Sequence, residues 1–425
     1  MAPDIVSKML DKPVAPPQTF NAMVVQTGAR HSYALPRMID EAGCLHSFHT
    51  TLAFRDNKSG IKAALKSVLP QGQRAKLDRR TVLGVPPQKT FASASADLAR
   101  FLTARRTNSA LQARLAQSAK LGERTIHRNL DHVDVAFIVD DSGGPELLRH
   151  LRAKGIPIAI DIVVTPMAHE LTAKAASDWP TWTTRVYSPD ERARYLKMYE
   201  DVIGLADLVM YPSEGVLEGL RHLQNFDESR STLVPYALGG IDPLPPATEP
   251  GRVLFAGSDA LRKGLPYVAA AAKLLKAQGQ DYEFVVAGGI PENIRELDDC
   301  SELNFLGYVS RDEMARQMSR ADILCLPSLA EGMAGVTLEA LASGVPCVVT
   351  KASGAPVYDG ENGLIVRECD TDGLAAAIRR VIEDRTLRQS LSDQALARSV
   401  EFTREAVKQK LIAALGSIAR SRSGS

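Results

Sequence analysis

The stretch LPSLAEGMAGVTLEALASGVP, from Leu326 to Pro346, places two acids, Glu331 and Glu339, in otherwise small and apolar surroundings. The apolar ADILCLP predicts a buried strand, SLAEGMAG a glycine-bearing turn and VTLEALAS a helix. On one continuous helix, eight positions would separate the two carboxylates by roughly 12 Å, which is too far for a tight acid pair. We therefore expect the two acids to contact different parts of one ligand.

The predicted turn has the features of an anion site. The first-turn amides of a helix have no intrahelical partners, so in a strand, turn and helix unit they face the turn and attract anions. Gly332 and Gly335 carry no side chain, which lets a diphosphate approach the backbone closely. The stretch thus predicts a diphosphate site flanked by Glu331 and Glu339.

Short apolar runs alternate with helical patterns along the whole chain, which is typical of parallel α/β sheets. The strand candidates of the first half are NAMVVQTGA, VDVAFIVDDSGG, IPIAIDIVV and ADLVMYPS. Those of the second half are RVLFAGS, YEFVVAGG, LNFLGYV, ADILCLPS and VPCVVT. Between the halves lies YALGGIDPLPPATEPGR, whose glycines and prolines predict a linker.

The chain of 425 residues is too long for one ordinary core. We predict an α/β protein with two Rossmann-like, doubly wound domains that face each other across a cleft. The domains are predicted at residues 19–240 and 252–404, with a linker at 241–251. Residues 1–18 are predicted to be disordered. Residues 405–420 are predicted to form a C-terminal helix that packs back on the N-terminal domain or stays on the C-terminal one.

The composition is that of an ordinary soluble globular protein, with 45% hydrophobic and 24% charged residues. No apolar run approaches the length of a membrane span, and the first twenty residues lack the apolar core of a secretory signal. We therefore expect a cytoplasmic protein. Its five cysteines form no CxxC pair, which predicts reduced, mostly buried thiols: Cys44, Cys300, Cys325, Cys347 and Cys369.

Positive charge is concentrated in residues 61–128. This segment has fourteen Lys and Arg against three acids, so it carries +11, and the rest of the chain carries −10. The segment predicts peripheral contact with an anionic membrane, on its inner face, or with an anionic acceptor. A solvated helical face is the alternative. Nucleic acid is not expected, because aromatic residues are nearly absent from the basic stretch.

The spacing of Glu331 and Glu339 resembles the E-x7-E signature of the retaining glycosyltransferases of the GT-B fold, in their large family four. The resemblance implies that Glu331 contacts the donor hexose and that Glu339 binds the ribose hydroxyls of the nucleotide. It also implies that the backbone of Gly335, Val336 and Thr337 contacts the donor diphosphate.

The stretch VLFAGSDALRKGLPYV resembles the segment in which an arginine and a lysine of this family neutralise the donor diphosphate. Lys263 matches the lysine, but Ser258 stands where the family usually has arginine. Losing a charge-assisted contact would weaken donor binding by roughly 1.5 to 3 kcal/mol. Arg262 is the candidate substitute, and the alternative is that it is a surface residue beside Lys263.

FLGYVSRDEM resembles the family's loop that frames the nucleotide base, which implies base contacts for Gly307, Tyr308 and Val309. Tyr308 could equally be an exposed aromatic at a strand end. The stretch SGAPVYDGENGLIV is similar to a later glycine-rich turn of the family, in compressed form and without its usual acid.

In the first half, QTGARHSYALPRMIDEAG fits a strand, a glycine loop and a helix. Gly28, Arg30 and His31 could therefore line the acceptor side of the cleft. A structural turn is the alternative. His169, in VVTPMAHELTAK, lies near the position of a cleft histidine in the family, which implies a catalytic role, although a lone histidine is often structural.

Asp370 and Asp372 have the DxD spacing that some other glycosyltransferases use to hold a metal ion. The helical LAAAIRRVIED follows at once, so an N-cap and a first-turn acid explain both residues, and we favour this interpretation. The resemblance implies no metal and no other cofactor.

The resemblance implies a retaining glycosyltransferase that moves a hexosyl unit from a nucleotide-diphosphate sugar to a glycan or lipid-linked acceptor, in bacterial polysaccharide or glycolipid synthesis. No protein nucleophile is implied. Two alternatives remain: a sugar-nucleotide epimerase of similar fold, and a non-catalytic nucleotide-sugar-binding partner, suggested by Ser258 and the shortened turn.

Overall fold

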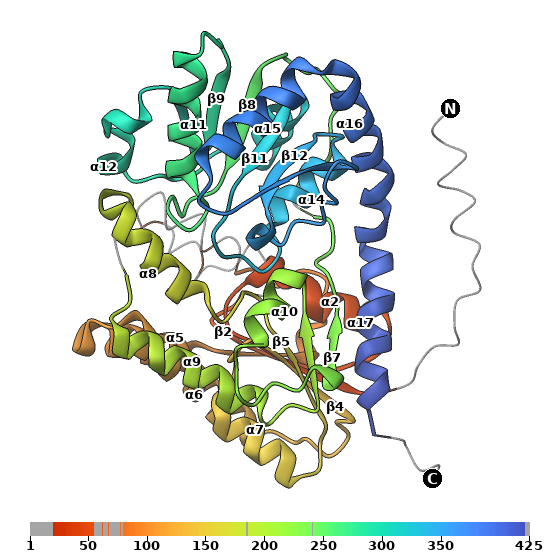
Figure 1. Ribbon diagram of the computed structural model, residues 1–425. Coiled ribbons are helices and arrows are strands. Elements are labelled where there is room, and N and C mark those ends of the chain that lie inside the picture. Colours follow the sequence, from red (N-terminus) through yellow and green to blue (C-terminus); the bar gives the residue numbers. More distant parts are fainter. Residues whose placement is uncertain are drawn as a thin grey trace.

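The computed structural model describes residues 20–54, 62, 67, 77, 80–183, 186–239 and 241–420. These residues form two parallel sheets flanked by helices, one above the other in Figure 1. The first sheet has the order β3-β2-β1-β4-β5-β6-β7 and the second the order β10-β9-β8-β11-β12-β13. Two doubly wound α/β domains were predicted, and this fold class is confirmed.

The N-terminal domain contains a sheet whose central strands are buried apolar runs, as expected when helices cover both faces. Its strands are β1 (Ala22–Gln26), β2 (Leu45–Thr51), β3 (Thr90–Ser93), β4 (Val135–Val139), β5 (Ile158–Asp161), β6 (Leu208–Tyr211) and β7 (Ser231–Leu233). Its helices are α2 (Ala34–Glu41), α5 (Ala94–Thr107), α6 (Ala110–Ile126), α7 (Gly144–Ala153), α8 (Ala168–Asp178), α9 (Pro189–Ile203) and α10 (Glu214–Leu220).

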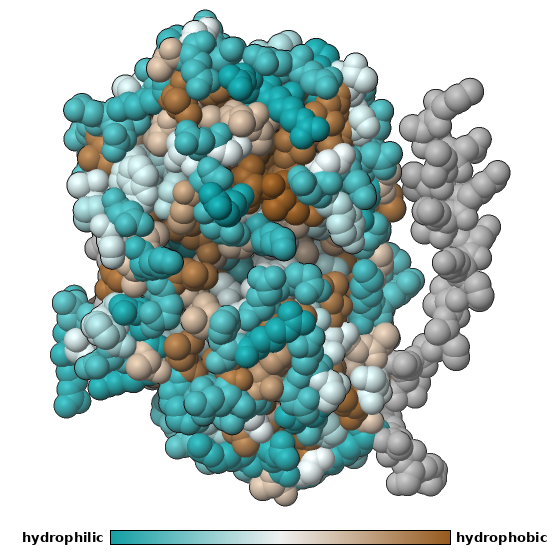
Figure 2. Space-filling model, in the orientation of Figure 1, coloured by the Kyte–Doolittle hydropathy of each residue, from teal (hydrophilic) through white to brown (hydrophobic). Residues whose placement is uncertain are grey.

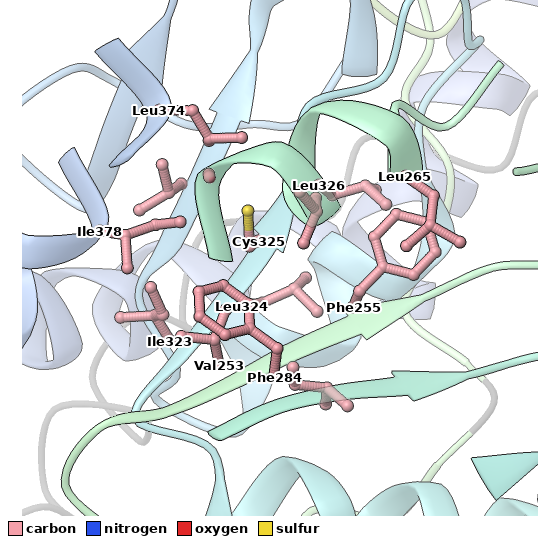
Figure 3. Close-up of a cluster of buried hydrophobic side chains, with 14 of the residues drawn as sticks. Val253, Phe255, Leu265, Phe284, Ile323, Leu324, Cys325, Leu326, Leu374 and Ile378 are labelled. Carbon is pink, nitrogen blue, oxygen red and sulfur yellow. The ribbon is translucent and has the colours of Figure 1, made fainter. Parts of the chain in front are cut away.

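The C-terminal domain repeats the scheme. Its strands are β8 (Arg252–Ala256), β9 (Glu283–Ala287), β10 (Leu303–Gly307), β11 (Ile323–Leu326), β12 (Cys347–Thr350) and β13 (Gly363–Val366). Its helices are α11 (Leu265–Ala277), α12 (Glu292–Arg295), α13 (Arg311–Arg320), α14 (Gly335–Ala342), α15 (Thr371–Glu383) and α16 (Arg385–Ser399). Figure 3 shows the core, where side chains of α15 lie over the central strand β11. This packing fixes the strand end from which the predicted diphosphate turn begins.

The chain crosses between the domains a second time near its C-terminus, along the right-hand side of Figure 1. Helix α17 (Arg404–Ile418) buries Val407, Leu411 and Leu415 in the apolar core between α2 and the first sheet. Arg404 pairs with Glu41 of α2 at 2.6 Å. The C-terminal helix therefore packs on the N-terminal domain, where its apolar face finds a partner.

Helix α8 belongs to the N-terminal domain but packs against the C-terminal one. Ala175 and Trp182 are buried in the same apolar cluster as the second sheet. The ring of Trp179 packs edge-on against that of Tyr267 in α11, with centroids 5.6 Å apart. These contacts hold the two domains together beside the groove that separates them in Figure 2.

The cysteines are free thiols, and all but Cys369 are buried, which confirms the prediction. Among the described residues, none of the helices combines the length and the apolar character that a membrane crossing requires. The segment predicted to be disordered, residues 1–18, lies outside the described residues, as does most of 61–79.

Candidate functional site

The turn between β11 and α14 is locked to the loop that follows β8. Gly264 has a φ of +76°, and a Cβ there would lie 2.0 Å from the carbonyl oxygen of Pro327. The amide of Leu329 donates to the carbonyl oxygen of Arg262 at 2.8 Å. Position 264 therefore requires glycine, and the locked loops bring the side chains after β8 to the β11–α14 turn.

Glu331 forms an ion cluster with the two cations after β8. Its carboxylate lies 2.7 Å from Nζ of Lys263 and 2.9 Å from Nη1 of Arg262. The exposed fractions of Glu331, Lys263 and Arg262 are 12%, 15% and 25%. Burial alone would raise the pKa of Glu331, but the attraction of the two cations outweighs it and lowers that pKa. The carboxylate stays ionised between the two cations, and Asp259 adds a second negative charge, because it pairs with Arg262 at 2.9 Å.

Arg262 has further contacts that fix its guanidinium group. Nη1 donates to the carbonyl oxygen of Ala330 at 2.8 Å, and Nε donates to the carboxylate of Asp259 at 2.9 Å. The burial of Arg262 and its contact with Glu331 favour the role of substitute over that of a surface residue, and this role stays a prediction.

Ser258 lies with the residues predicted to frame the base. Its Oγ accepts the amide of Gly289 at 3.4 Å. The exposed ring of Tyr308 covers the same glycine, where a Cβ would lie 2.2 Å from the ring. The carbonyl oxygen of Gly307 accepts the amide of Gly288 at 2.8 Å, and half-buried Val309 follows. Loops after β8, β9 and β10 thus form one surface at the carboxyl edge of the sheet.

The first turn of α14 presents its backbone to this surface. Gly335 is exposed and Val336 is half-buried, and Ala334 before them has no side chain that could cap the helix. The hydroxyl of Thr337 donates to the carbonyl oxygen of Ala334 at 2.6 Å, so it is already satisfied. The backbone amide of Thr337 also donates to this carbonyl oxygen, at 2.9 Å, so the predicted contact of its backbone with a diphosphate stays a prediction.

Gly332 has a different role from the one we expected. A Cβ there would lie 1.9 Å from the carbonyl oxygen of Val163, which belongs to the N-terminal domain. Ser213, also of that domain, donates from Oγ to the carbonyl oxygen of Gly332. The missing side chain thus makes room for the opposite domain rather than for a diphosphate.

Glu339 is half-buried on α14. Burial raises its pKa to about 7, and Arg311 opposes this shift only in part. The acid therefore ionises near neutral pH, whereas Glu331 stays ionised well below it. The two glutamates therefore have opposite pKa shifts. This difference agrees with the expectation that they contact different parts of one ligand.

The N-terminal domain presents a strained turn to the interface. His31, Ser32 and Tyr33 have φ values of 47°, 49° and 62°, in the left-handed region. Each such residue costs about 1–2 kcal/mol. The side chain of Gln26 holds the turn by donating to the carbonyl oxygens of Gly28 and Arg30. Strain of this kind concentrates at functional sites, which supports the predicted acceptor side.

The strained turn contacts the segment that follows β7, beside the β11–α14 turn. The ring of His31 lies 4.2 Å from that of Tyr236, centroid to centroid. The hydroxyl of Tyr236 donates to the carbonyl oxygen of Val163 at 2.8 Å, next to Gly332. The structure therefore brings Gly28, Arg30 and His31 to the same interface as Glu331.

Two acids of the N-terminal domain, Asp140 and Asp161, also lie at this end of its sheet, and the sequence patterns did not lead us to predict them as site residues. Asp140 follows β4 and accepts from Arg114 and Tyr199, at 2.5 and 2.6 Å. Asp161 ends β5, and burial raises its pKa to about 7 against the opposing effect of Arg30. The signal was present, because both acids stand at the carboxyl ends of buried strands, where ligands of such sheets bind.

His169 lies in an aromatic cluster, with its ring 4.0 Å from that of Tyr187 and 4.5 Å from that of Tyr195. Burial lowers its pKa to about 4, and Arg114 and Arg262 add to the shift, so the imidazole is neutral. This packing favours the structural alternative for His169, and its catalytic role stays a prediction.

Asp370 caps α15, since its side chain accepts the amide of Gly373 at 2.9 Å. This contact agrees with the favoured interpretation of the DxD spacing.

The fold defines a GT-B protein, in which the C-terminal domain carries an ion cluster of Lys263, Arg262 and Glu331 at the β11–α14 turn. Residues 250–384 match the family described as glycosyl transferases group 1, which confirms the resemblance for this domain. Over 143 residues the chain is 37% identical to phosphatidyl-myo-inositol mannosyltransferase of Mycolicibacterium smegmatis. The match covers 32% of this chain and 37% of that protein. The chain thus spans little more than a third of that relative's length.

Solved structures extend the likeness in fold to nearly the whole chain. Sucrose-phosphate synthase from Thermosynechococcus elongatus superposes with a TM-score of 0.61 at 18% identity, covering 93% of this chain and 97% of that one. Anabaena HepE, in complex with UDP and glucose, gives a TM-score of 0.58 at 14% identity, covering 94% and 100%. The arrangement of both domains is therefore that of known GT-B structures.

Proposed function

We propose that this protein is a retaining glycosyltransferase that moves a hexosyl unit from a nucleotide-diphosphate sugar to a hydroxyl of a glycan or lipid-linked acceptor, in bacterial polysaccharide or glycolipid synthesis. The observation that carries the proposal is the contact of Glu331 with Lys263 and Arg262, beside the exposed first turn of α14. It lies in the domain that matches the family, and HepE binds UDP on the same fold.

The chemistry follows from the charges. As the sugar leaves, negative charge develops on the diphosphate, and Lys263, Arg262 and the first-turn amides of α14 stabilise it. Before the donor binds, Glu331 neutralises part of this positive charge, which keeps the two cations in place. No protein nucleophile, metal or cofactor is assigned. Closure of the two domains around the bound donor would exclude water and limit hydrolysis of the donor.

The test is a panel of UDP-, GDP- and ADP-sugars, scored by thermal stabilisation and then by product analysis. One nucleotide class is expected to stabilise the protein, by about 2.7 kcal/mol at a concentration of 100 Kd. With acceptor glycans or glycolipids present, the sugar is expected on the acceptor with its anomeric configuration retained. An isomerised sugar from donor alone would indicate the epimerase instead. Donor binding without turnover on any acceptor would indicate the non-catalytic partner.

Helix α5 supports the proposed contact with an anionic membrane. Leu98, Phe101 and Leu102 share one face by their spacing and are each more than half exposed, while Ala96 on the opposite face is buried. The guanidinium group of Arg105 lies 4.5 Å from the centroid of the Phe101 ring, and Arg106 is exposed beside it. An apolar face bordered by arginines suits the interface of an anionic bilayer.

Vesicle cosedimentation tests this contact. Binding to phosphatidylglycerol vesicles is expected to exceed binding to phosphatidylcholine vesicles, and to weaken with salt because exposed charges are screened. Replacing Leu98 and Phe101 by Gln, or Arg105 and Arg106 by Glu, should reduce binding at least tenfold. Arg221→Glu, on an exposed arginine of the same domain, is the control. If both double variants bind as the wild type does, α5 is not the contact.

A further inference from the structure

A cavity of about 270 Å³ lies in the N-terminal domain, between the edge strand β3, the start of α5 and the end of α6. It is lined by His49, Phe91, Ala92, Ser93, Ala94, Ser95, Leu121, Arg124, Thr125 and Arg128. All of these belong to the N-terminal domain, so the cavity is separate from the β11–α14 turn. Neither the family match nor the proposed donor site includes it.

The cavity has a positive rim and no negative charge in its lining. Arg124 and Arg128 are exposed, and the described residues that line the cavity include no acid. The guanidinium group of Arg128 lies 4.7 Å from the centroid of the Phe91 ring, which holds it over the opening. Nε of Arg124 donates to Oγ of Ser95 at 3.4 Å. Both guanidinium groups thus have N–H groups left that can donate hydrogen bonds to a ligand.

The floor of the cavity is aromatic and neutral. The buried ring of His49 stacks on Phe91 with centroids 5.1 Å apart, and its Nε2 shares a hydrogen bond with Oγ of Ser47 at 3.1 Å. Burial lowers the pKa of His49 to about 3, and Arg128 and His46 add to the shift. His49 therefore adds no charge, and the two arginines set the sign of the potential.

Further donors come from the start of α5. The hydroxyls of Ser93 and Ser95 lie 3.0 Å apart, and Ser93 does not cap the helix with its side chain. The acid of the first turn, Asp97, is already neutralised, because it accepts from the amide of Leu52 at 2.6 Å and from Arg80 at 2.8 Å. Guanidinium groups, hydroxyls and first-turn amides at one opening are the donors that bind phosphate.

We propose that this cavity binds the phosphate group of a phosphomonoester or phosphodiester, at a site distinct from the donor diphosphate site. The aromatic floor of Phe91 and His49 accommodates the organic part of such a ligand. The phosphate can come from a lipid headgroup, since α5 also carries the exposed apolar face, or from a water-soluble phosphate.

The test uses glycerol phosphate as probe, in the full-length protein with Lys263→Ala, so that the donor site does not contribute. Isothermal titration is expected to show saturable binding. Ala94→Glu should weaken binding at least tenfold, because it places a negative charge at the exposed rim. A glutamate in the first turn of a helix favours folding. Ala104→Glu, with the same charge near the far end of α5, should bind as the parent does.

A second variant and a second probe complete the test. Arg124→Gln with Arg128→Gln should also lose glycerol phosphate binding. With phosphatidylglycerol vesicles, a parallel loss in this variant identifies a lipid headgroup as the source, whereas unchanged vesicle binding identifies a soluble phosphate. Absence of saturable binding in the parent, or equal binding by Ala94→Glu and Ala104→Glu, would overturn the proposal.

Discussion

Glu331→Gln is expected to lower the rate of glycosyl transfer by roughly 100- to 1000-fold, while nucleoside diphosphate still binds. The carboxylate holds Lys263 and Arg262 at 2.7 and 2.9 Å and faces the turn where the donor sugar is proposed to lie. Glutamine keeps the shape but removes the negative charge. The two cations then attract the diphosphate with one competing carboxylate fewer, so its dissociation constant should stay equal or fall.

Lys263→Gln is the matched contrast, because it removes a positive charge from the same cluster. Both transfer and nucleoside diphosphate binding should fall, the latter by the roughly 1.5 to 3 kcal/mol of a hydrogen bond to a charged group. Glu361→Gln, on an exposed acid of the same domain, should leave both unchanged. The comparison needs initial rates and titration calorimetry on the three variants. Full activity of Glu331→Gln, or loss of binding together with transfer, would exclude the proposed role.

The donor half of the site could be predicted because its signal is local. Strand β11, the turn with Glu331 and helix α14 fall within twenty consecutive residues, and their order defines the geometry of the first-turn amides. Local sequence could not decide whether Arg262 faces the donor site or the surface. Its position depends on Gly264 fitting against Pro327, a contact between residues more than sixty positions apart.

The N-terminal half of the site was harder to predict, because it too depends on contacts between residues far apart in the sequence. Tyr236 follows β7, near the end of the N-terminal domain, yet it reaches both His31 and Val163, and only the folded chain brings these residues together. Gly332 was given a ligand-binding role because nothing in its own segment reveals the domain behind it. Asp140 and Asp161 could have been found, since acids at the ends of buried strands are expected at the binding edge of a parallel sheet.

Glu339→Gln is expected to stabilise the ligand-free protein above pH 7 and to abolish stabilisation by the nucleotide sugar. Burial raises the pKa of Glu339 to about 7 in the folded protein, from an ordinary value of 4.5. The folded state therefore prefers the protonated acid. Its contribution to stability is complete below pH 4.5 and is lost as the pH rises through 7. Glutamine cannot ionise and avoids this loss, which amounts to about 1–3 kcal/mol for a half-buried group.

Thermal unfolding of the wild type, Glu339→Gln and Glu361→Gln across pH 5 to 8.5 measures the effect. The midpoint of Glu339→Gln should exceed that of the wild type by an amount that grows through pH 7, and Glu361→Gln should follow the wild type. In the ribose contact that the resemblance implies for Glu339, the hydroxyls donate to the ionised acid, so wild-type donor affinity should fall up to tenfold for each pH unit below 7. A difference in midpoint that does not depend on pH would mean that Glu339 does not titrate here. Donor binding that survives in Glu339→Gln would remove this acid from the ribose site, because an ionised acceptor is what the proposed contact requires.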